Sequence, residues 1–186
     1  MNRIHAIAFA AVSALALLIG PGAHAAAPPL APPPVAPPMV TGGDKLTLQQ
    51  LHQANQTAID MARLASTKGS TRSVRDYART LIDEHTLADR KLDEYLRRRG
   101  SDLAALGSTT SADADHELLA TKSGLDFDRA FADQMVRDHQ TVLDRLSSAV
   151  LETSDDVLRL LYEQLTTTER AHKRVAESLL AATARS

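Results

Sequence analysis

The sequence has no cysteine and no tryptophan, and its aromatic residues are three tyrosines and three phenylalanines. Without cysteine, the chain can form neither a disulfide framework nor a thiolate metal site, and it offers no thiol for lipid attachment. Proline is absent after residue 38, because all eight prolines lie between Pro21 and Pro38. Over residues 46–186 the helix formers Ala, Leu, Arg and Glu, together with Asp, dominate instead. This composition predicts an all-α fold.

The first 25 residues have the pattern of a secretory signal peptide. Arg3 supplies a positive charge, residues 4–19 form an apolar run, and Ala23-His24-Ala25 matches an A-x-A cleavage site. A membrane anchor is the alternative, but the run falls short of the roughly 20 residues that a spanning helix needs. We therefore expect cleavage near Ala25, a periplasmic or otherwise exported product, and no integral membrane span after cleavage.

Residues 26–45 form a Pro/Ala-rich linker ahead of a single domain at 46–186. The proline-dense part is either an extended spacer or a passive disordered tail, and the residues leave both open. Loss of Arg3 on cleavage leaves 20 basic against 23 acidic residues, a net charge of −3. An acidic domain of this kind is not expected to bind nucleic acid. No protein partner can be named, and homo-oligomerisation is left open.

Apolar residues with helical spacing predict four long helices. Thr47-Leu48-Gln49-Gln50 is typical of a capping box, Gly69 and Gly100 of helix ends, and Ser154 of a helix start. The roughly 25 residues between the second and third helices, with one short helix at 115–122, are too many for a tight turn. They indicate a ferritin-like four-helix bundle, in which two helical hairpins are joined by a long crossover. The four predicted helices are residues 48–68, 71–99, 126–153 and 155–184.

Histidines interrupt the apolar seams of these helices. In the second helix the seam residues recur at spacings of four and three, and one of them is His85. His139 and His172 occupy seam positions in the third and fourth helices, and His52 is the candidate in the first, where Leu51 competes for the same position. At 1.5 Å per residue, all four lie roughly 22 to 27 Å from the nearest hairpin turn, close to the middle of the bundle.

Four histidines at one level predict either a metal site or a hydrogen-bonded polar layer. Imidazole binds zinc, iron and copper, so a transition metal (Zn, Fe or Cu) is the candidate cofactor, with His85, His139, His172, Glu169 and His52 as candidate ligands. Glu169 belongs to the single Glu-x-x-His motif, whereas Ile82 and Val136 precede the other histidines by three residues. A ferritin-type di-iron site, which needs carboxylates from all four helices, is therefore not expected. In the polar layer, Asn55, Gln56, Thr168 and Glu169 would be the partners.

The chain resembles an exported bacterial family called domain of unknown function 4142, over residues 48–180. The resemblance lies in MARLA at 61–65, YARTLIDEH at 77–85, SGLDFDRAF at 123–131 and MVRDH at 135–139. It implies a ferritin-like bundle in the bacterial envelope, with recurring polar positions at Glu84-His85, Asp138-His139 and His172, but no established activity. The chain departs from the family by carrying Ala58 and Asp60 where glutamates are frequent.

Three functional hypotheses follow. The first is a non-catalytic envelope protein whose midline histidines bind a transition metal. The second is a ferritin-like oxidoreductase or metal-storage protein, and the third is a structural or partner-binding module. No catalytic triad order, phosphate loop or nucleotide fingerprint occurs in the sequence, so we do not expect an enzyme, although the iron chemistry of the second hypothesis leaves the question open.

Overall fold

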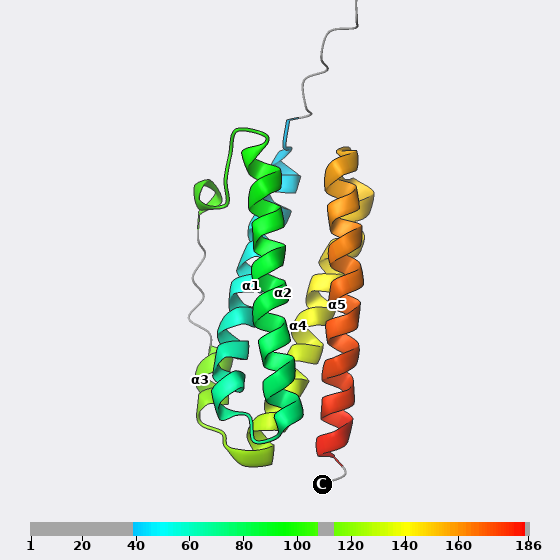
Figure 1. Ribbon diagram of the computed structural model, residues 1–186. Coiled ribbons are helices and arrows are strands. Elements are labelled where there is room, and N and C mark those ends of the chain that lie inside the picture. The colour runs from blue at the N-terminus through cyan, green and yellow to red at the C-terminus, as the bar shows by residue number, and fades with distance from the viewer. Residues whose placement is uncertain (1–38, 108–113, 185–186) are drawn as a thin grey trace, which may run out of the picture. The chain divides into compact units, whose positions relative to one another are not determined.

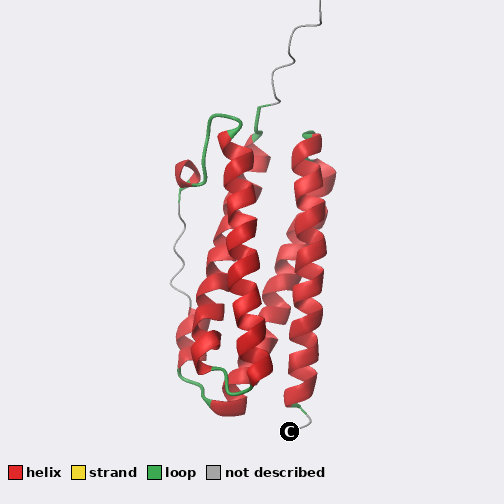
Figure 2. Ribbon diagram, viewed as in Figure 1, coloured by secondary structure: helices red, strands yellow, loops and turns green. Residues whose placement is uncertain are grey.

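The computed structural model describes residues 39–107 and 114–184, and within these ranges all regular structure is helical (Figures 1 and 2). The predicted all-α fold is confirmed. The predicted signal peptide and the linker up to residue 38 lie outside the described residues. The helices are α1 (Gly42–Lys68), α2 (Arg72–Arg97), the 3-10 helix η1 (Ala104–Leu106), α3 (Ala114–Ala120), α4 (Gly124–Glu152) and α5 (Asp156–Thr183).

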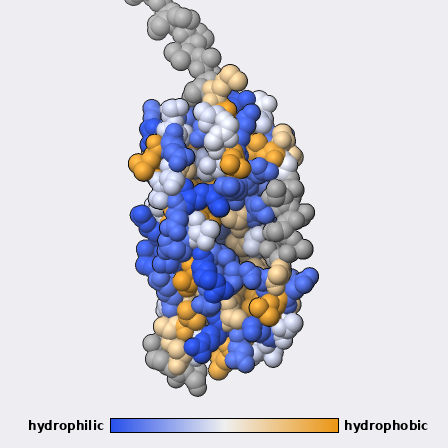
Figure 3. All heavy atoms as spheres, turned by 180° about the vertical axis from the view of Figure 1, so that it is seen from behind, coloured by the Kyte–Doolittle hydropathy of each residue, from blue (hydrophilic) through white to orange (hydrophobic). Residues whose placement is uncertain are grey.

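The four long helices pack lengthwise in two antiparallel pairs (Figure 1). Short turns join α1 to α2 and α4 to α5, while α1 also packs on α4 and α2 on α5. Between α2 and α4 the chain carries η1 near the end of α2, and then α3, which packs against α1 and α4. No helix within the described ranges is long and apolar enough to cross a membrane. The face seen in Figure 3 is largely hydrophilic, with its hydrophobic residues scattered.

Two helix caps differ from the sequence prediction, and α4 begins at Gly124, two residues earlier than predicted. Helix α1 begins at Gly42, inside the predicted linker, since Thr41 Oγ1 accepts a hydrogen bond from the backbone N–H of Asp44 at 3.1 Å and donates to its carboxylate. Helix α5 is capped by Asp155 and not by Ser154, because the Asp155 carboxylate accepts from two backbone N–H groups of the first turn. Helix α2 ends at Arg97, two residues earlier than predicted.

A buried carboxylate fastens α4 to the turn between α1 and α2. Asp128 is fully buried, and it accepts hydrogen bonds from Ser70 N at 2.7 Å, Ser70 Oγ at 3.0 Å and Thr71 N at 2.8 Å. These N–H groups belong to the start of α2, where a negative charge is favourable. The contact fixes α4 lengthwise against the first pair of helices.

A second buried charge lies at the opposite end, where α2 finishes and α5 begins. The Asp155 carboxylate accepts from Tyr95 OH at 2.9 Å and pairs with Arg99, whose guanidinium lies over the Tyr95 ring. Burial raises the pKa of Asp155, but hydrogen bonds from Leu158, Tyr95 and Arg99 outweigh it, so the pKa lies below its usual value. The side chain of Arg99 is therefore a buried ion-pair partner of Asp155.

The hydrophobic core is divided into two clusters by a polar layer. One cluster occupies the end that holds Leu48, Leu92 and Leu158, and the other occupies the end that holds Met61, Leu81 and Phe131. Every long helix passes from one cluster to the other, and each carries buried polar residues at the crossing. These residues are Asn55, His85, His139, Glu169 and His172.

Candidate metal centre

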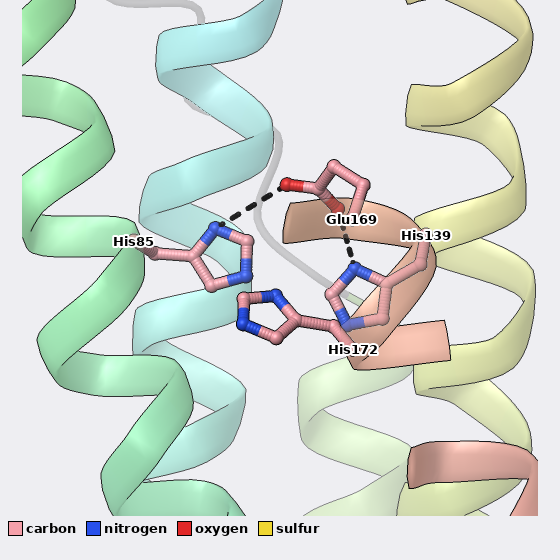
Figure 4. Close-up of side chains that lie close together, drawn as sticks. All are labelled: His85, His139, Glu169 and His172. Carbon is pink, nitrogen blue, oxygen red and sulfur yellow. Dashed lines mark hydrogen bonds and ion pairs between the residues drawn. The ribbon is translucent and has the colours of Figure 1, made fainter. Parts of the chain in front are cut away.

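Three histidines and one glutamate converge in the polar layer (Figure 4). His85 comes from α2, His139 from α4, and Glu169 and His172 from α5. Each offers one ligand atom, these atoms all lie within 4.8 Å of one another, and each residue is at most 3% exposed. Glu169 and His172 lie three residues apart on a helix and therefore share one face. Of the sequence-predicted ligands, the structure brings these four together.

The imidazole rings are close enough to surround a single ion. The ring centroids of His85 and His139 are 5.6 Å apart and the rings are nearly parallel, while His172 is 5.1 and 5.2 Å from the other two. Glu169 lies beside them, with Oε2 at 2.7 Å from His139 Nδ1 and Oε1 at 3.9 Å from His85 Nδ1. Figure 4 shows the carboxylate between His85 and His139.

Hydrogen bonds outside the cluster hold two of the rings from behind. His172 Nε2 donates to Glu84 Oε2 at 2.7 Å, and His139 Nε2 lies 3.1 Å from the Tyr77 hydroxyl. Tyr77 donates its proton to the backbone carbonyl oxygen of His172 at 3.0 Å. Because that carbonyl can only accept, the Tyr77 oxygen is left to accept from His139 Nε2–H.

His85 is held in a similar way, by a chain of side chains that starts on α1. Its Nδ1 lies 2.9 Å from Asn55 Oδ1, and Asn55 Nδ2 donates to Asp89 Oδ1 at 2.7 Å. His52, the remaining predicted ligand, does not join the cluster. Its Nδ1 lies 3.0 Å from Asp89 Oδ2, and its side chain is 27% exposed.

Two buried ring nitrogens in the centre have no hydrogen-bond partner among the described residues. They are Nε2 of His85 and Nδ1 of His172. Buried polar atoms are nearly always paired, so two such atoms in one cluster require an explanation. A nitrogen whose partner is a metal ion is one such explanation.

Burial keeps His85 and His172 neutral, whereas Glu169 stays charged. Burial lowers the pKa of His85 to about 4, the Glu169 charge opposes that shift, and the neighbouring histidines add to it. Burial also lowers the pKa of His172. For Glu169, burial raises the pKa, but the hydrogen bond with His139 and the neighbouring imidazoles outweigh it and keep the pKa below its usual value. Burial raises the pKa of Tyr77, so its hydroxyl stays protonated.

Several residues that form hydrogen bonds with the cluster are not among the candidate ligands predicted from the sequence. Glu84, which the family resemblance gives as a recurring polar position, has a side chain that is 46% exposed, yet its carboxylate reaches His172. Asn55 was expected as a partner in a polar layer and meets His85, whereas Gln56 donates to Asp89 and Thr168 to the Gln164 carbonyl oxygen of its own helix. Tyr77 opens the YARTLIDEH segment and Asp89 follows it, but neither was singled out from the sequence, because a buried tyrosine and a partly buried aspartate have many other uses.

The profile of the family described as domain of unknown function (DUF4142) matches residues 29–179, and the chain belongs to this family. No curated protein matches the sequence. Some solved structures have a similar fold. A DUF305 fragment from Deinococcus radiodurans superimposes with a TM-score of 0.69 and 23% sequence identity, and the match covers 78% of this chain and 99% of the fragment.

CopM is a second similar protein with solved structures. Its Cu(I)-bound form has a TM-score of 0.63 and 22% identity, covering 73% of this chain and 93% of its own. Its Cu(II)-bound form has a TM-score of 0.65 and 20% identity, covering 75% and 96%. At these identities the similarity establishes a shared helical fold.

Proposed function

We propose that this member of the DUF4142 family binds one transition-metal ion between His85, His139, His172 and Glu169. The observation that carries the proposal is the pair of unpartnered buried nitrogens, His85 Nε2 and His172 Nδ1, beside a buried carboxylate. Imidazole nitrogen and carboxylate oxygen are ordinary ligands of zinc, copper and iron, and four of them complete a tetrahedral shell.

The hydrogen bonds behind the rings support this assignment, because they occupy one nitrogen of His172 and one of His139 and leave the other nitrogen of each ring to the cluster. Glu84 accepts from His172 Nε2–H, which leaves Nδ1 bare. Tyr77 accepts from His139 Nε2–H, which leaves Nδ1 facing Glu169. Metal-binding histidines commonly donate their other N–H to a carboxylate or another acceptor in this manner.

The distances allow one ion after small movements. Tetrahedral ligands at 2.0 to 2.1 Å from zinc lie roughly 3.3 Å apart. His139 Nδ1 and Glu169 Oε2, now 2.7 Å apart with a proton between them, would separate slightly as the ion replaces that proton, and the wider pairs, up to 4.8 Å, would close. With a single carboxylate in the cluster, a di-iron site of the ferritin type is disfavoured.

Copper is the first ion to test. Nitrogen-rich sites of this kind hold Cu²⁺ more tightly than the other divalent first-row metals, and the structurally similar CopM has been solved with Cu(I) and Cu(II). We place this site in a ferritin-like four-helix bundle (residues 46–186, now with α1 starting at Gly42) that is exported by the signal peptide at residues 1–25. A holding or transfer role is favoured over catalysis, because the residues of the cluster are at most 3% exposed and a larger substrate would not reach them.

Metal analysis of the chelator-stripped protein after titration with Cu²⁺, Zn²⁺ or Fe²⁺ tests the proposal. We expect one tightly bound ion per chain. His139→Ala and Glu169→Gln should each weaken binding by more than the roughly 10–100-fold typical of losing an outer partner. His116→Ala, on the short helix α3 and outside the cluster, is the matched control and should still bind one ion. If the wild type binds less than one ion per chain, or if His139→Ala binds the metal as tightly as the wild type, the proposal is refuted and the hydrogen-bonded polar layer is favoured.

A further inference from the structure

Helix α1 supplies no ligand to the cluster, yet it contacts His85 through Asn55. We propose that Asn55 and Asp89 are positioning residues that fix the tautomer of His85, so that Nε2 is the bare nitrogen facing the centre. The inference deepens the proposed function and rests on it. It assigns a role to the α1–α2 contact that neither the family nor the ligand set describes.

The direction of each hydrogen bond follows from the chemistry of Asp89. Its ionised carboxylate can only accept, so Asn55 must present its NH₂ group to Asp89 Oδ1. That choice turns Asn55 Oδ1 toward His85 Nδ1, 2.9 Å away. An amide oxygen can only accept, so Nδ1 of His85 must carry a proton. Nε2 of His85 meets no hydrogen-bond partner among the described residues, so Nδ1 is the nitrogen that holds the proton and Nε2 is left bare.

Polar side chains of α1 hold Asp89, the first member of this chain of hydrogen bonds, in place. Three side chains of α1, His52, Asn55 and Gln56, all approach the same carboxylate, which gives it a fixed orientation. His52 therefore occupies the exposed end of the chain, and the tautomer of His85 is set at the other end. The fourth midline histidine thus acts through Asp89 and Asn55.

Replacing Asp89 with asparagine should reverse the donor and acceptor roles along these hydrogen bonds, with almost no change in the shape of the side chain. The new amide can donate to Asn55 Oδ1, which would turn the Asn55 NH₂ group toward His85 Nδ1. A donor at that place requires a bare Nδ1 and moves the proton to Nε2, where it blocks the metal. Metal-free Asp89→Asn protein should therefore contain a substantial population of the Nε2–H tautomer.

Long-range ¹H–¹⁵N NMR of metal-free protein reads the tautomer directly and needs no metal. The wild type should show His85 protonated at Nδ1, and Asp89→Asn should show a mixture or a complete change. Asn55→Leu, which removes the acceptor, should also lose the pure Nδ1–H form. If Asp89→Asn fails to fold, Asn55→Leu provides the same readout. Asp83→Asn removes an equal charge from an exposed position of the same helix, and it should leave the tautomer unchanged.

Zn²⁺ titration of the same proteins measures the consequence for binding. Asp89→Asn and Asn55→Leu should keep one site per chain but bind Zn²⁺ roughly 10–100-fold more weakly, as expected for lost outer partners. Asp83→Asn should match the wild type. An unchanged tautomer or an unchanged affinity in both variants overturns the inference. If the tautomer changes but the wild type binds no Zn²⁺, Cu²⁺ or Fe²⁺, the hydrogen-bond chain stands and the proposed metal site is refuted.

Discussion

Acidification of the metal-free protein tests whether His85 is buried in its neutral form. An unfolded histidine has a pKa of 6.5, and burial lowers that of His85 to about 4. Between these values the unfolded chain binds the extra proton and the folded chain does not. The free energy of unfolding should therefore fall as the pH falls from 6.5 toward 4.

The pKa difference sets the magnitude. At 1.36 kcal/mol per pH unit, the shift corresponds to about 3 kcal/mol when protonation is complete, and most of this is lost by about pH 4.5. His172, whose pKa burial also lowers, adds to the loss as the pH falls below 6.5. The pKa of Glu169 is also lowered, from an unfolded value of 4.5, so its contribution to stability is lost only at lower pH, as the pH falls below that value.

Urea unfolding followed by far-ultraviolet circular dichroism, in the presence of a chelator, provides the assay. The wild type is compared with His85→Gln, which lacks the titrating group, from about pH 7 to about pH 4.5. The stability of the variant should depend on pH less steeply, by about 2 to 3 kcal/mol over this range. His116→Gln on the partly exposed α3 helix is the matched control and should keep the wild-type slope. Equal slopes for His85→Gln and the wild type would refute the assignment of a neutral, buried His85.

Two further predictions concern the contacts that hold the helices in register, and both are checked by urea unfolding at neutral pH. Asp128→Ala should destabilise the protein by roughly 3 kcal/mol, because three donors at the start of α2 lose their acceptor. Asp126→Ala, at an exposed position of the same helix, should cost less than about 1 kcal/mol. Similar losses in the two variants would show that the contact between Asp128 and the start of α2 does not stabilise the fold. Arg99→Met should lower the free energy of unfolding by about 3 kcal/mol or more, because Asp155 keeps a buried charge without its cation. Arg98→Met, which breaks an exposed ion pair, should lower it by less than about 1 kcal/mol. A small effect of Arg99→Met would mean that Asp155 is stabilised by its other hydrogen bonds alone.

The ligand side chains could be predicted from spacing because helical periodicity is a local property. His85, His139 and His172 each stand where an apolar residue would continue the seam, so a period of three and four places them inside. Glu169 shares a face with His172 by the same rule. The first helix shows the limit of the method. Leu51 and Asn55 take the inward positions there, which leaves His52 about 100° away and partly exposed.

Helix starts were harder to predict because several side chains compete to cap each one. Thr41 and Thr47 both begin plausible capping patterns, and the one that satisfies the backbone earlier extends the helix to Gly42. At the start of α5, Asp155 provides the stronger acceptor than its neighbour Ser154 and is also drawn inward by Arg99. Such choices depend on partners that are distant in sequence.

The sequence by itself determined that the domain is helical, that its core histidines share one level, and that no thiolate takes part, because composition and period are carried by neighbours along the chain. Tertiary structure alone decided which nitrogen of each histidine has a partner. Glu84 reaches His172 across 88 positions, Tyr77 reaches His139 across 62 and Asn55 reaches His85 across 30. Hydrogen bonds have direction and a reach of about 3 Å, so only the packed helices can fix them.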